Sequence, residues 1–72
     1  MVNFSEMSKV LEAIKPDGSL NKKEFKWRSI NSISKSTKLT VRKVVMALGM
    51  NADQLKFKTA DDGKFMVMYS GE

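Results

Sequence analysis

Cysteine and histidine are both absent from this sequence of 72 residues. Without cysteine no disulfide and no thiolate metal site can form, and without histidine the commonest proton shuttle and metal ligand is missing. Asp53, Asp61 and Asp62 fall at expected turns, where the preferences of turns and helix caps explain them. No glycine-rich phosphate-binding loop is present. We therefore expect neither an enzyme nor a protein that holds a metal ion or a cofactor.

Long apolar runs are also missing. No segment approaches the ~20 apolar residues that a transmembrane helix needs, and polar residues interrupt the first fifteen positions too often for a signal peptide. The 42% of hydrophobic residues is sufficient for one small domain with one core. We expect a soluble cytoplasmic protein that has no contact with membranes.

Basic residues gather in the middle of the chain, which carries a net charge of +5. Residues 22–43 hold eight lysines and arginines against one acid, Glu24, and no acid occurs from Phe25 to Ala52. Charge segregated in this way is expected where a protein surface meets phosphates. A lysine-rich solubilising surface has the same composition, so the charge pattern leaves both interpretations open.

The first helix is predicted from about Phe4 to Lys15, because apolar residues recur at helical spacing at Met7, Val10, Leu11 and Ile14. Asn3 and Glu6 have the spacing of a capping box at its start, and Pro16 prevents its continuation. A second helix is predicted from about residue 22 towards residue 33. It begins with another capping-box pair, Asn21 and Glu24, and its many serines predict a break near residues 28–31.

The third helix is predicted from about Val41 to Met50. Thr40 is placed to cap its N-terminus, and Leu39 is placed to fill the turn before it. Helical spacing turns four residues towards the core: Val41, Val44, Ala47 and Leu48. It turns another five outward: Arg42, Lys43, Met46, Gly49 and Met50.

After residue 51 the apolar period changes from that of a helix to that of a strand. Residues 55–59 alternate between apolar and polar, residues 60–63 form a turn, and residues 64–70 return. A two-residue turn would pair Phe57 with Met68. A three-residue loop with Gly63 in the left-handed conformation would pair Phe57 with Val67 and Leu55 with Tyr69. We prefer the second register, because it collects the larger apolar side chains on one face.

Two features together resemble the winged helix-turn-helix family. The first is the order of three helices followed by a hairpin, and the second is the pattern Thr37-x-Leu39-Thr40-x-x-x-Val44-x-x-Ala47-Leu48. The resemblance covers nearly the whole chain. It implies an α+β fold in which three helices precede a C-terminal two-stranded β-hairpin. Residues 1–72 would form one domain, with the helix-turn-helix at about 22–50 and the wing hairpin at about 54–70.

This family resemblance implies sequence-specific or semi-specific binding of double-stranded DNA by a small transcriptional regulator, which would be nucleoid-associated. The third helix would enter the major groove, and the wing would follow the backbone or the minor groove. Arg42 is the outward side chain that can contact guanine with two hydrogen bonds. The expected DNA-binding residues are Lys35, Lys38, Thr40, Arg42, Lys43, Met46, Lys56, Lys58 and Lys64.

Two features of the sequence depart from the family pattern. Lys38 occupies the turn position usually taken by glycine, and must adopt a positive φ if the turn is standard. Asp61 and Asp62 lie at the expected wing tip, where they would repel phosphate. The tip itself is therefore not expected to hold DNA.

An alternative function is a protein-binding winged helix, such as a phage-type regulator or inhibitor of host machinery. Its surface would be rich in methionine, contributed by Met46, Met50, Met66 and Met68. A third interpretation is single-stranded nucleic acid stacked on Phe25 and Trp27. A DNA-binding domain of this size contacts only about half of a typical operator, so useful specificity would require a homodimer or a protein partner.

Overall fold

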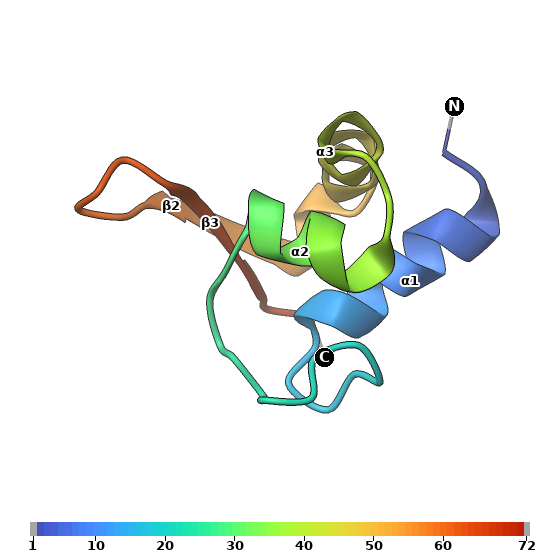
Figure 1. Cartoon of the computed structure of the whole chain (residues 1–72), viewed down its shortest axis with the longest axis horizontal. Coiled ribbons are helices and arrows are strands. Elements are labelled where there is room, and N and C mark those ends of the chain that lie inside the picture. The colour runs from blue at the N-terminus through green and yellow to red at the C-terminus, as the bar shows by residue number, and fades with distance from the viewer. Residues whose placement is uncertain (1, 72) are drawn as a thin grey trace.

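The computed structural model describes residues 2–71, which form an α+β domain of three α-helices and a three-stranded antiparallel sheet (Figure 1). In chain order the elements are α1 (Phe4–Ile14), β1 (Arg28–Ser29), α2 (Ile30–Thr37), α3 (Val41–Met50), the 3-10 helix η1 (Ala52–Gln54), β2 (Leu55–Thr59) and β3 (Phe65–Tyr69). The helices gather at one end of the molecule, and the hairpin of β2 and β3 extends away from them (Figure 1). This layout is compatible with a small winged helix.

The N-terminus of α1 is built as the sequence predicted. The Glu6 amide donates to Asn3 Oδ1 over 2.8 Å, and the Asn3 amide donates to Glu6 Oε1 over 3.1 Å, which completes a capping box. The helix ends at Ile14, and Lys15 before the proline is its C-cap. The prediction of this helix is confirmed to within one residue at its end.

The predicted helix from residue 22 is wrong, because residues 16–27 contain no helix. The Asn21 side chain does not cap a helix. Its amide nitrogen donates to the carbonyls of Lys15 and Phe25, and its oxygen accepts from the Phe25 amide. Glu24 has a φ of 54°, in the left-handed region that interrupts a right-handed helix. The helix α2 begins at Ile30, where the Ser29 hydroxyl caps it.

The sheet has three strands, so the predicted count of two was wrong. β1 pairs with β3 in the antiparallel sense, with Arg28 opposite Val67 and Ser29 opposite Met66, and the strand order is β1-β3-β2. The sequence did not reveal β1, because backbone groups make the hydrogen bonds of such a pair and no particular side chain is needed. Two residues are also too few to show the alternation of polar and apolar side chains that identifies a strand in a sequence.

The hairpin has the predicted three-residue loop and the preferred register. Leu55 lies opposite Tyr69, and Phe57 lies opposite Val67. Gly63 has a φ of 86°, which a residue with a side chain adopts only with strain. The register fixes which residues share a face of the sheet, because side chains alternate along a strand.

The core lies where the helices meet the buried end of the hairpin. Its buried members are Val2, Val10, Ala13, Ile14, Ile33, Val44, Ala47, Leu48, Leu55 and Val67. The predicted inward position of Val41 was wrong, because this side chain is 45% exposed. Val41 is the first residue of α3 and lines a shallow groove with Lys64 and Phe65 instead.

Candidate nucleic-acid interface

The turn between α2 and α3 is held by side-chain hydrogen bonds at both ends. Thr37 Oγ1 donates to the Ile33 carbonyl over 2.8 Å, and the Ser34 hydroxyl donates to the Leu39 carbonyl. Lys38 has φ 61° and ψ 25°, the left-handed conformation that a standard turn requires there. These contacts fix both sides of the turn, and so they keep Lys38 in a left-handed conformation that glycine adopts with less strain.

Two predicted features of the α3 N-terminus are confirmed. Thr40 Oγ1 accepts a hydrogen bond from the Lys43 amide over 3.2 Å and so caps the helix. Leu39 is partly buried against the core. The turn therefore presents Lys38 and Thr40 to solvent beside the first turn of α3.

The outward face of α3 carries one cation among apolar side chains. Arg42 is exposed, and neither of the two ion pairs found among residues 2–71 includes it. Around it, Val45, Met46 and Met50 are 47%, 41% and 57% exposed. Gly49 completes this face, and open space surrounds the position where a Cβ would lie. The exposed face of α3 thus combines the Arg42 guanidinium with an apolar surface.

Lys43 points away from this face towards α1. Its Nζ lies 2.7 Å from Glu6 Oε2, and the Lys43 side chain remains 43% exposed. This hydrogen bond, together with that from the Asn3 backbone amide, holds the pKa of the Glu6 carboxyl below its ordinary value. Lys43 therefore ties the start of α3 to the start of α1, and any phosphate contact would have to compete with Glu6.

Replacing Glu6 by glutamine is expected to make the free energy of unfolding fall less steeply as the pH is lowered. The lowered pKa means that the folded protein binds this proton less readily than the unfolded chain. The contribution of the carboxylate is complete above the unfolded pKa of about 4.3, and is lost as pH falls through the lower folded pKa. Urea unfolding between about pH 7 and pH 3 would measure it. Lys9→Gln is the charge control. An equal loss of unfolding free energy on acidification in Glu6→Gln and in the wild type would contradict the expectation.

The three lysines of the predicted wing do not all lie on one surface. Leu55 and Val67 are buried on the sheet face that packs on the helices, so alternation places Lys56 and Lys58 on the opposite face. Lys58 Nζ lies 4.4 Å from the centroid of the Trp27 ring. Lys64 instead follows the loop and lines the groove beside the start of α3.

The structure thus divides the predicted DNA-binding residues into groups. Lys38, Thr40 and Arg42 are exposed in the turn and in the first turn of α3, and Lys35 is exposed on α2. Met46 lies on the outward face of α3, one helical turn beyond Arg42. Lys64 lies across the groove from Val41, whereas Lys43 pairs with α1, and Lys56 and Lys58 occupy the far face of the sheet.

Sequence reasoning missed the role of Arg28, which it counted among the surface basic residues. The side chain is only 7% exposed and reaches under α2. Nη2 donates to the hydroxyls of Ser32 and Ser36. The spacing of four residues between each of these three positions was the available signal, because it places two hydroxyl acceptors in line on one side of a helix.

Comparisons of the chain with models of protein families, with curated proteins and with solved structures found no match. Among residues 2–71 no helix is long and apolar enough to cross a membrane. The same residues contain no group of three or more acidic side chains placed to hold a metal ion.

Proposed function

We propose that this protein binds double-stranded DNA as a small, semi-specific transcriptional regulator. The observation that carries the proposal is the exposed Arg42 at the start of α3, beside the turn that presents Lys38 and Thr40. A helix presented in this way can enter a major groove with its N-terminal residues towards the base edges. Lys64 lines the groove beside the start of α3 and would supply a phosphate contact there, in competition with Asp62, whose Oδ2 lies 3.9 Å from its Nζ.

The charge distribution supports the same partner. No acid interrupts residues 25–52, so α2, the turn and α3 carry only basic charges. Lys35 and Lys38 would supply phosphate contacts, which position a protein on DNA without reading its sequence. Arg42 would read a guanine and supply most of the specificity, and Met46 would add only a weak apolar contact to a thymine methyl. Specificity from so few base contacts is low, which is why the proposal is semi-specific binding.

A second function has its own support in the apolar surface of α3. Val45, Met46 and Met50 are each more than 40% exposed, which is unusual for a helix that reads polar base edges. Methionine surfaces adapt to several protein shapes. Docking on a protein partner is therefore the alternative, and Arg42 would then steer the approach of the partner rather than read a base.

Titration of the labelled protein with random-sequence duplex DNA, followed by NMR at two salt concentrations, tests the first proposal. We expect shifts in residues 38–50 and around Lys64. The logarithm of the affinity should fall with the logarithm of salt at a slope of about −0.9 for each phosphate neutralised. Lys38→Gln should reduce this slope, and Lys9→Gln, an equal charge change on α1, should not. Shifts confined to α1, or an affinity insensitive to salt, would refute the proposal.

A further inference from the structure

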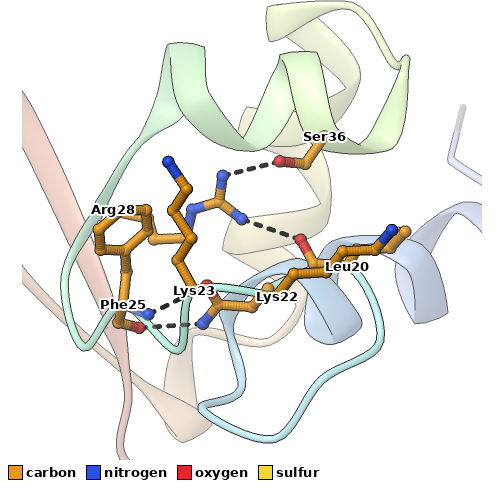
Figure 2. A pocket seen from close by; sticks show the side chains of 7 residues that line it. Leu20, Lys22, Lys23, Phe25, Arg28 and Ser36 are labelled. Carbon is orange, nitrogen blue, oxygen red and sulfur yellow. Dashed lines mark hydrogen bonds between the residues drawn. The ribbon is translucent and has the colours of Figure 1, made fainter.

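A pocket of about 430 Å³ opens between the loop of residues 16–27 and α2. It is lined by Leu20, Asn21, Lys22, Lys23, Phe25, Arg28 and Ser36, and we refer to it as the Arg28 pocket (Figure 2). None of these residues belongs to α3, β2 or β3. No residue proposed to contact DNA lines the pocket, although Ser36 follows Lys35 directly on α2.

The guanidinium of Arg28 forms the inner wall of this pocket. Nη1 donates to the carbonyls of Ala13 and Leu20 over 2.8 and 3.2 Å. Nη2 donates to the Ser36 hydroxyl over 2.7 Å, and to both the hydroxyl and the carbonyl of Ser32. Figure 2 shows the bonds to Leu20 and Ser36 on two sides of the group. All of these acceptors are neutral.

Arg28 therefore carries a buried charge that has no carboxylate partner. Neither ion pair among residues 2–71 includes it, and its Nε is buried without an acceptor in that part of the chain. Burial lowers the pKa of Arg28, which reflects this missing compensation. The Ala13 carbonyl lies in the last turn of α1 and offers only the partial negative charge of a helix end. Arginines this deeply buried are usually paired with an acid.

The rim adds positive charge and an apolar wall. Lys22 and Lys23 both line the opening, and no acidic residue does. In Figure 2 the Lys23 side chain extends past the guanidinium, and the Lys22 side chain extends in the other direction beside Leu20. The Phe25 ring centroid lies 6.0 Å from the guanidinium carbon, and Leu20 closes another side. The pocket thus combines three cations with a hydrophobic surface.

We propose that the Arg28 pocket binds the dianionic phosphate group of a small organic phosphate. Arginine, lysine and serine hydroxyl are the groups that proteins use to hold phosphate oxygens, and three cations match a dianion better than a carboxylate. The pocket volume lies in the range of small-molecule sites, about 300–1,000 Å³. It leaves room for an organic body, which would pack against Leu20 and Phe25.

Binding would also complete the electrostatics of the buried guanidinium. The phosphate supplies the negative charge that Arg28 lacks within the described chain. Because Nη1 and Nη2 already donate to protein acceptors, Arg28 would attract the phosphate by its charge, and the direct donors would be the Ser36 hydroxyl and the lysine ammonium groups. Lys23 would contact the same group from the solvent side, and Lys22, which extends along Leu20 in Figure 2, would turn towards it on binding. The loop of residues 16–27, which the ligand would join to α2, should become more resistant to opening.

The test is an NMR titration of the full chain with phenyl phosphate, inorganic phosphate and benzoate at constant ionic strength. We expect saturable shifts in the amides of residues 20–25 and of Ser36. Phenyl phosphate should bind more tightly than inorganic phosphate, because it also covers Leu20 and Phe25, and benzoate should bind most weakly. Lys22→Gln/Lys23→Gln should weaken phenyl phosphate about tenfold.

Lys9→Gln/Lys26→Gln is the matched control, since it removes the same charge at positions that do not line the pocket. This control should bind phenyl phosphate as the wild type does. An equal loss in both double variants would overturn the proposal, because it would show attraction by net charge alone. Shifts that never saturate would also overturn it, and so would shifts of the pocket amides by duplex DNA but by neither phosphate.

Discussion

Replacing Arg28 by methionine is expected to lower the free energy of unfolding by about 3 kcal/mol. The guanidinium joins the end of α1, the loop at Leu20 and one side of α2 through its five hydrogen bonds. Without it, acceptors such as the Ala13 carbonyl lose their partner in a buried place, at a cost of about 1–3 kcal/mol each. Removal of a desolvated, unpaired charge offsets part of this cost. Methionine fills a similar volume, so the effect of a cavity is small.

Urea unfolding followed by the fluorescence of Trp27 would measure this change. Small domains have a total stability at the low end of about 5–15 kcal/mol. The urea concentration at which half of the protein is unfolded should therefore be much lower for the variant than for the wild type. Ser36→Ala is the graded control. It removes one of the five hydrogen bonds and should cost only about 1 kcal/mol. If Arg28→Met were as stable as the wild type, the five hydrogen bonds would do no more than offset the cost of burying the charge, which would contradict the expectation.

Arg42→Ala is expected to weaken binding to a preferred duplex by about 1–3 kcal/mol and to relax the preference at one base pair. The side chain is exposed at the start of α3 and can place two donors on the O6 and N7 of a guanine. Duplexes selected from a random pool, compared by fluorescence anisotropy at fixed salt, would supply the measurement. Lys35→Ala is the matched control, because a phosphate contact should weaken all sequences by a smaller and similar amount.

The same pair of measurements separates DNA binding from protein docking. If α3 reads DNA, the double variant Met46→Gln/Met50→Gln should bind the preferred duplex within a few-fold of wild type. If α3 docks on a protein, these changes should abolish the interaction, and Arg42→Ala should mainly slow association. Absence of duplex binding at low salt, together with a captured partner that the methionine variant cannot hold, would decide against DNA.

Elements with strong local signals were predicted correctly from the sequence. The capping pair Asn3 and Glu6 fixes the start of α1 through contacts within one helical turn. Thr40 does the same for α3, and Gly63 selects the loop length and hence the register of the hairpin. Such signals are readable because each device acts between residues a few positions apart.

The segment of residues 16–29 could not be predicted in this way. Asn21 and Glu24 have the spacing of a capping box, but the same asparagine side chain can hold a loop by bonding Lys15 and Phe25. Local preference does not choose between these two uses of a short amide. The observed loop brings Arg28 to the end of α1 and to the side of α2, and these contacts between distant segments are not visible in the local pattern.

The directions of the surface side chains were also predicted only where local spacing determines them. Helical spacing showed correctly that Arg42, Met46 and Met50 face solvent. It also placed Lys43 outward, although Glu6, far away in the sequence, draws this ammonium towards α1. Strand alternation separated Lys56 from Phe57, but only the packed sheet shows that the lysine face is the one turned away from the helices.

The sequence by itself determined the first and third helices, the hairpin and its register, and the concentration of basic charge in the middle of the chain. Short-range hydrogen bonds and the periodicity of apolar residues carry that information. Only the tertiary structure decided the third strand, the loop of residues 16–27 and the burial of Arg28. The pairing of β1 with β3 is made by backbone groups and leaves no side-chain pattern. The burial of Arg28 also depends on the distant carbonyls of Ala13 and Leu20, which its spacing from Ser32 and Ser36 does not reveal.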